Sequence, residues 1–242
     1  MIWVVGVTAL AAGLLVGLTG IGGVLLVPVL TGAAGLPLER AVAACMLGFL
    51  FSGLYSAFIH LRRAQLPARP VAALCVAAAC GAALGAATLD RLPDTGVRLF
   101  VAALAFGSGA HALLSRQVAA GRIPGATLLA FLGLFVGYGS AISGTGGPVM
   151  LIPILLALRT PVTAAIALGV TAGMPITAAA TAVYAAEGQV DLPLALTLAA
   201  LLIAGTWAGA RLSARLSGRA LTAAVAWTLV GVGVWFAYAS LR

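Results

Sequence analysis

SGTGGPVMLIP, residues 143–153, interrupts a long apolar run with three glycines in four residues. Pro148 follows directly, and proline suits the first turn of a helix because its missing N–H would be unpaired there anyway. We therefore predict that one helix stops before the glycines and another starts at Pro148. Such a start presents free N–H groups and the positive end of a helix dipole, which together can seat an anion. The N–H groups expected to be free are those of Thr145, Gly146, Gly147 and Val149.

An earlier stretch repeats this device. Thr19-Gly20-Ile21-Gly22-Gly23, followed by Val24-Leu25-Leu26-Val27-Pro28, has the same S/T-G-x-G-G pattern and lies 124 residues before its counterpart. Two copies of one helix break predict a duplicated fold with paired sites. The copies differ, because Ser143 replaces Thr19 and one extra residue separates the last glycine from the later proline. The two sites therefore need not be equivalent.

The composition is that of a polytopic membrane protein. Of the 242 residues, 63% are hydrophobic and 7% are charged, and the mean hydropathy is +1.18. These values exclude an ordinary soluble core. The thirteen cationic residues are all arginines and give a net charge of +8. They lie in short loops at segment ends, so they indicate topology and not nucleic-acid binding.

Apolar segments long enough to cross about 30 Å of hydrocarbon fill almost the whole chain. We predict helices, because the segments are too long and too rich in Ala and Leu for the strands of a membrane barrel. The start of the chain lacks a positively charged region and is expected to belong to the mature fold. The predicted segments are 2–18 with a continuation at 24–31, 41–60, 70–89, 96–114, 123–142 with a continuation at 148–158, 162–184, 192–212 and 219–241.

Sliding the sequence by 124 residues aligns more than the two breaks. The same offset places Pro37 on Pro161, Gly81 on Gly205 and Gly85 on Gly209. Glycine is common, with 31 of 242 residues, but a single offset aligns the breaks, a loop and these helix-face glycines together. We therefore predict two homologous membrane repeats, residues 1–118 and 119–242. The four-residue spacing of the glycines predicts close helix packing.

The arginines predict how the two repeats are oriented. If each broken segment dips into the membrane and returns, three crossings remain in each half, and the arginines divide nine to four between the two sides. This division satisfies the positive-inside rule, and three crossings would invert the second repeat and leave the termini outside. If all eight long segments crossed, the division would be seven to six. The predicted inner face carries Arg62, Arg63, Arg69, Arg116, Arg122, Arg159, Arg211, Arg215 and Arg219, and the outer face carries Arg40, Arg91, Arg98 and Arg242.

No acidic residue or arginine lies convincingly at the middle of an apolar segment, so a site would be built mostly from backbone and hydroxyl groups. The breaks supply N–H groups, and Thr19, Ser143 and Thr145 supply hydroxyl donors. Alternatively, the glycines only permit a tight turn between packed helices. The predicted anion-binding residues are Thr19, Gly20, Gly22, Gly23, Ser143, Gly144, Thr145, Gly146 and Gly147.

Further polar residues lie on the helices that follow the breaks. His60 aligns with Tyr184, and both are candidates for a gate or for proton handling, although a lone histidine there can also be an interface residue. Pro175 predicts a kink that frees a helix carbonyl. Other hydroxyls could line a path, although such groups often bond back to helix carbonyls. These are Ser52, Ser56, Thr177 and Thr181.

The sequence contains no signature of an enzyme, a metal site or a cofactor site. It lacks paired carboxylates, HExxH and a Cys/His ligand set, and its glycine motifs lack the GK[S/T] of a Walker loop and the strand of a Rossmann loop. The cysteines Cys45, Cys75 and Cys80 lie in apolar segments at irregular spacing, which favours small buried thiols. We therefore predict no enzymatic activity, no cofactor and no metal.

Two motif strings, GLTGIGGVLLVP at 17–28 and SGTGGPVMLIP at 143–153, carry a family resemblance. The stretch PVTAAIALG at 161–169 and the half-length repeat add to it. In these features, and over essentially its whole length, the chain resembles the sulfite exporter TauE/SafE family of membrane permeases. The resemblance implies export of small sulfur-containing anions, such as sulfite or sulfonates, across the cytoplasmic membrane by a secondary mechanism.

Together these observations predict an all-α polytopic membrane protein with two inverted repeats, each a glycine-broken, re-entrant helix plus three transmembrane helices. The expected function is a secondary transporter that holds its anion at the N-termini of the two broken helices. A passive anion channel and a non-transporting membrane assembly subunit are the alternatives. The expected partners are a small anionic substrate and the lipid bilayer, and the oligomeric state is left open.

Overall fold

A computed structural model describes residues 2–61, 66–93, 96 and 121–213, together with the single positions 223, 227, 230, 231 and 234. Its described elements are all helical, and no strand occurs among them. The helices predicted at 96–114 and 219–241 lie outside the described residues except at single positions. The eight described α-helices are α1 (Ile2–Thr19), α2 (Leu26–Gly32), α3 (Leu38–Leu61), α4 (Ala68–Ala86), α6 (Ala126–Ser143), α7 (Pro148–Ala157), α8 (Val162–Ala186) and α9 (Leu192–Ser213).

Five of these helices, α3, α4, α6, α8 and α9, are long and apolar enough to cross a membrane. The shorter helix α7 and the stretch Trp3–Leu18 of α1 are also apolar. Two 3-10 turns, η1 (Gly23–Leu25) and η2 (Leu89–Arg91), complete the described elements. The prediction of an all-α, multi-pass membrane protein is therefore confirmed.

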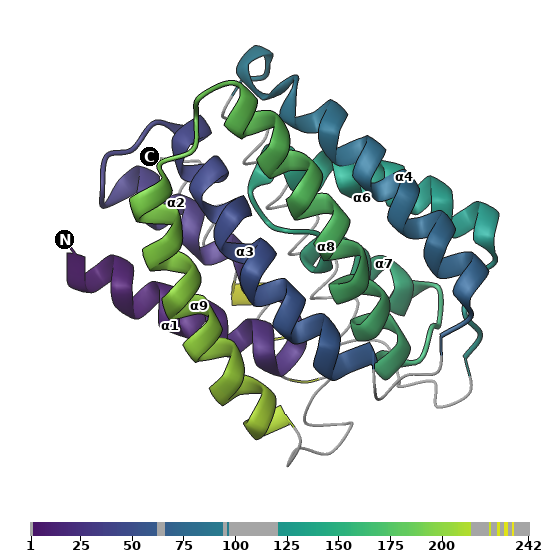
Figure 1. Cartoon of the computed structure of the whole chain (residues 1–242). Helices are drawn as coiled ribbons and strands as arrows, with labels where there is room; N and C mark the ends of the chain where they lie inside the picture. Colours follow the sequence, from purple (N-terminus) through teal and green to yellow (C-terminus); the bar gives the residue numbers. More distant parts are fainter. Residues whose placement is uncertain are drawn as a thin grey trace.

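The helices form a central pair with a pair on each flank. Helices α3 and α8 pack side by side at the centre and run in opposite directions (Figure 1). Helix α1 packs along α9 on one flank, and α4 packs along α6 on the other (Figure 1). The flanking pairs thus join helices from opposite halves of the sequence.

Glycines bring α4 and α6 into backbone contact. A Cβ at Gly81 would collide with the carbonyl oxygen of Leu134, and a Cβ at Gly85 would lie 2.5 Å from that of Tyr138. Because lipid supplies no hydrophobic force between helices, their contact depends on such close backbone approach. The residue numbers of the contacting pairs rise together, from Gly81 and Leu134 to Gly85 and Tyr138, so α4 and α6 run parallel.

The α1–α9 pair has the same construction. A Cβ at Gly205 would meet the carbonyl oxygen of Leu10, and a Cβ at Gly209 would meet that of Leu14. Each of these four positions lies 124 residues from its counterpart in the α4–α6 pair, so the two contacts are equivalent in sequence. The close packing predicted from the glycine spacing is confirmed on both flanks.

Pro175 lies inside α8, and the helix continues past it to Ala186. Proline has no N–H to donate to the carbonyl oxygen four residues earlier, which belongs to Thr171. That oxygen instead faces the thiol of Cys75 on α4, with an Sγ to O distance of 3.9 Å. The predicted free carbonyl is therefore present, and it contacts the neighbouring helix.

Candidate functional site

The second break contains three glycines in left-handed conformations. Gly144, Gly146 and Gly147 have φ values of 70°, 77° and 106°, which residues with a side chain rarely adopt. Gly144 caps α6, and the next N–H, that of Thr145, donates to the carbonyl oxygen of Ser140 at 3.2 Å. The prediction of a free N–H at Thr145 is therefore wrong, because this helix cap uses it.

The restart after the break occurs at Pro148, as predicted, and opens the ten-residue helix α7. The N–H groups of Met150 and Leu151 donate to the carbonyl oxygen of Gly147. Within the described part of the chain, no hydrogen bond uses the N–H groups of Gly146, Gly147 or Val149. Three of the four predicted donors therefore remain open at the positive end of α7.

The first break ends its helix in the same way but restarts differently. Gly20 has φ 78°, and its N–H donates to the carbonyl oxygen of Val16 at 2.9 Å. Gly22 has φ −160°, which is extended backbone, and the 3-10 turn that follows leads into α2, a helix of only seven residues. Val24 stands where the second break has Pro148, so no proline fixes a helix start there. The two breaks are therefore not equivalent.

A cavity of about 30 Å³ lies where the two breaks meet. A Cβ on Gly23 would lie 2.6 Å from the carbonyl oxygen of Thr145, so the breaks are in direct contact beside it. No charged residue is among the described residues that line the cavity. The lining residues are Gly20 and Gly23 of the first break, Thr145, Gly146 and Pro148 of the second, Val16 of α1, Phe49, Ser52, Gly53 and Ser56 of α3, and Val170, Gly173 and Thr177 of α8.

Four of the predicted binding residues have other neighbours. Gly22 packs against Ala12 and Val16, Gly144 against Val27 and Val42, and Gly147 against Ile176 and Gly173. Ser143 is buried and does not line the cavity. These four residues shape the turns. The side chain of Thr19, at the end of α1, lies outside the described part of the chain.

Two predicted hydroxyl donors are engaged within the break itself. The Oγ of Ser143 donates to the carbonyl oxygen of Gly139 at 2.6 Å and lies 3.0 Å from the Oγ1 of Thr145. Because the single hydroxyl proton of Ser143 is used toward Gly139, Thr145 is the donor in the second bond. Neither proton is free for a ligand in this arrangement.

Ser56 differs from the other hydroxyls on the cavity. Thr177 Oγ1 donates to the carbonyl oxygen of Gly173 at 2.8 Å, and Ser52 Oγ lies 3.5 Å from that of Phe49. Ser56 is 1% exposed, lines the cavity and has no hydrogen-bond partner among the described residues. A buried hydroxyl left unpaired costs roughly 1–3 kcal/mol. Ser56 therefore carries the one unpaired hydroxyl among the described residues that line the cavity.

Replacing Ser56 separates this role from ordinary packing. We expect Ser56→Ala to raise the free energy of unfolding by about 1 kcal/mol without ligand and to weaken anion binding about tenfold. The matched control is Thr206→Val on α9, which removes another buried hydroxyl without a described partner, away from the cavity. It should gain stability and keep its affinity. Equal affinities in both variants, measured by anion-dependent thermal shift, would remove Ser56 from the site.

Of the two candidate gate residues, Tyr184 lies away from the cavity, and the side chain of His60 is not described. Tyr184 on α8 is 1% exposed, and its hydroxyl donates to the carbonyl oxygen of Ala141 near the end of α6 at 3.0 Å. It therefore ties α8 to the second break without lining the cavity. His60 belongs to α3, but its side chain lies outside the described part. Thr181 does not line the cavity either.

Phe49, Gly53, Val170 and Gly173 line the cavity but were not predicted. They are ordinary apolar or small residues in helices, and only the crossing of α3 and α8 brings them to the breaks. The 124-residue offset pairs Phe49 with Gly173, and this exchange of a large for a small residue was the one available signal in the sequence.

Five candidate spans, with two glycine-broken segments that meet at a cavity beside α3 and α8, define a multi-pass α-helical membrane protein. The sequence model of the sulfite exporter TauE/SafE family matches residues 4–236 of the 242, and the chain belongs to this family. The resemblance carried by the two motif strings is thereby confirmed. No curated protein and no solved structure matches the chain.

Proposed function

We propose that the protein is a secondary transporter that exports a small sulfur-containing anion, sulfite or an organosulfonate, across the cytoplasmic membrane. The observation that carries the proposal is the cavity between the two breaks. Gly146, whose N–H is open, and Pro148, which starts α7, line the same space as Ser56, whose hydroxyl is unpaired among the described residues. Membership of the TauE/SafE family supports the substrate class.

Backbone and hydroxyl donors suit an anion that must be both bound and released. Hydrogen bonds to a charged group contribute about 1.5–3 kcal/mol each, so several of them offset part of the cost of removing the anion from water. The positive end of the α7 dipole adds to this attraction. No arginine is among the described residues that line the cavity. The first break forms the facing wall through Gly20 and Gly23.

We further propose that residues 1–118 and 119–242 are inverted repeats. Helices α1, α3 and α4 begin at residues 2, 38 and 68, and α6, α8 and α9 begin 124 residues later, at 126, 162 and 192. A two-fold rotation would turn the α1–α9 contact into the α6–α4 contact, and both contacts are present. The opposite directions of α3 and α8 fit an axis in the membrane plane (Figure 1).

Each broken segment is proposed to be re-entrant. In the second half, Gly121, which precedes α6, packs against the carbonyl oxygen of Arg159, which follows α7. This contact supports a path that returns to the side where it entered. In the first half, α1 runs parallel to α9, and α3 runs opposite to α8. Because α9 starts on the side of the membrane where α8 ends, α1 and α3 start on the same side.

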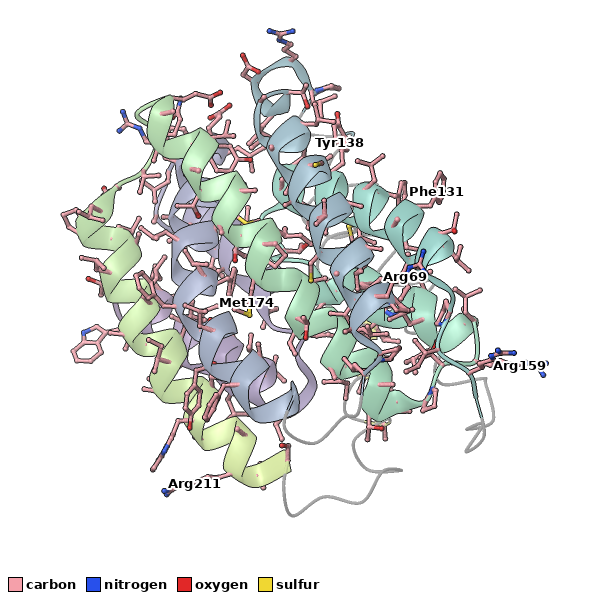
Figure 2. All side chains as sticks on the ribbon, turned by 45° about the vertical axis from the view of Figure 1, so that its right-hand side comes forward. Arg69, Phe131, Tyr138, Arg159, Met174 and Arg211 are labelled. Carbon is pink, nitrogen blue, oxygen red and sulfur yellow. The ribbon has the colours of Figure 1, made fainter. Side chains whose placement is uncertain are left out.

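The described arginines support the proposed orientation. Arg69 opens α4, Arg159 precedes α8 and Arg211 lies near the end of α9, and the chain path places these three at one end of the helices. Figure 2 shows Arg159 and Arg211 directed away from the helical body. Arg40 at the start of α3 and Arg91 after α4 lie at the opposite end. The positive-inside rule then assigns the first group to the cytoplasm.

Transport by the purified protein in liposomes tests the proposal. We expect sulfite or methanesulfonate to accumulate against its own gradient when a pH gradient is imposed, and sulfate and chloride to be carried about tenfold more slowly. Dissipation of the anion gradient without accumulation would instead identify a passive channel. No flux of any of these anions by a folded protein would favour the assembly subunit.

A further inference from the structure

We propose that the phenyl ring of Phe49 sets the largest anion that the cavity admits, an inference that rests on the proposed function. Phe49 lies on α3, is 6% exposed and lines the cavity. A Cβ on Gly23 would lie 3.0 Å from its Cε2, and a Cβ on Gly146 would lie 3.6 Å from its Cδ2. The ring therefore packs against both breaks at once.

The cavity is small with the ring in this position. Its volume is about 30 Å³. Sulfite has four non-hydrogen atoms, and methanesulfonate has five. A sulfonate with a much larger substituent therefore enters only if one wall of the cavity moves.

Phe49 is the wall best able to move. The lining glycines contribute only backbone, and the ring of Pro148 is fixed to its own backbone. Val16 and Val170 are β-branched, which restricts rotation about χ1. Phe49 carries the largest side chain among the described residues that line the cavity, and a change of rotamer would displace its ring without moving a helix. The volume that this ring vacates then limits the size of the anion.

The equivalent position in the second half cannot do the same. The 124-residue offset pairs Phe49 with Gly173, where a Cβ would lie 2.8 Å from the carbonyl oxygen of Gly146 and 3.4 Å from Pro148. A side chain at 173 would therefore collide with the second break. The size limit is set from α3 alone, which distinguishes the roles of the two central helices.

The test compares flux of sulfite, methanesulfonate and benzenesulfonate in liposomes. We expect Phe49→Ala to raise the ratio of benzenesulfonate flux to sulfite flux by about tenfold or more, and Phe49→Leu to raise it by a smaller factor. Phe49→Leu retains most of the buried volume and decides the question if Phe49→Ala fails to fold. The matched control is Met46→Ala, one turn earlier on α3, where a fully buried side chain lies off the cavity.

Three results would contradict the inference, and they are distinguishable. An unchanged ratio in folded Phe49 variants that still carry sulfite would overturn the role of Phe49 and leave the proposed function intact. An equal rise in Met46→Ala would overturn it as well, because loosened packing alone would then explain the change. Absence of sulfite and methanesulfonate flux in the wild type would overturn the proposed function and this inference with it.

Discussion

Gly146→Ala is expected to lower anion flux at least about tenfold while the protein stays folded. Gly146 has φ 77°, lines the cavity and carries one of the open N–H groups. An added methyl group would stand in a space of about 30 Å³ and meet the ring of Phe49 at 3.6 Å. The left-handed backbone would add a strain of about 1–2 kcal/mol. Flux in liposomes and thermal unfolding of the same preparation measure both effects.

Gly188→Ala is the matched control for this variant. Gly188 has φ 70°, follows α8 in an exposed turn, and has no atom within 4 Å of the position of a Cβ. Its replacement introduces the same kind of backbone strain without touching the cavity, so it should lose similar stability and keep its flux. If both variants lost flux equally, strain alone would explain the result and the cavity would not be the site.

Gly137→Ala should destabilise the protein by about 3 kcal/mol. The added Cβ would collide with the carbonyl oxygen of Ala78 on α4, and a backbone group cannot avoid it by changing rotamer. Gly13→Ala should cost a similar amount, because its Cβ would meet the carbonyl oxygen of Leu202 at the equivalent place between α1 and α9. Thermal unfolding in detergent compares the two variants.

Gly6→Ala serves as the control for these packing variants. Gly6 lies in α1 with no atom within 4 Å of a Cβ, so alanine there should be neutral or stabilising by about 0.5–1 kcal/mol. A Gly137→Ala protein as stable as the wild type would contradict the close α4–α6 contact. Markedly different losses at Gly13 and Gly137 would contradict the equivalence of the two flanks.

The helices and their breaks could be predicted because local rules determine them. Left-handed glycines end α1 at Gly20 and α6 at Gly144, and Pro148 starts α7, as the sequence indicates. The 124-residue offset found in the sequence recurs in the starts of the helices. The difference between the helix starts after the two breaks also has a local cause. Val24 stands in place of the proline, and a 3-10 turn precedes α2.

The state of each donor could not be predicted, because it depends on neighbours that the pattern does not reveal. The N–H of Thr145 is used by the cap that Gly144 forms, and the hydroxyl of Ser143 bonds back one helical turn to Gly139. Ser56 has the same sequence context as other helical serines, and only its place on the cavity distinguishes it. Phe49 joins the site through the packing of α3 against both breaks.

The most direct test of an anion site between the two breaks is the position of a bound anion in an experimental structure. Selenite is a close analogue of sulfite, and its selenium can be located by anomalous scattering. We predict a selenium peak in the cavity, with a selenite oxygen within about 3.2 Å of the Gly146 nitrogen and near the Ser56 hydroxyl. Selenite bound only at the arginines of the proposed cytoplasmic face, with the cavity empty at saturating concentration, would contradict the account.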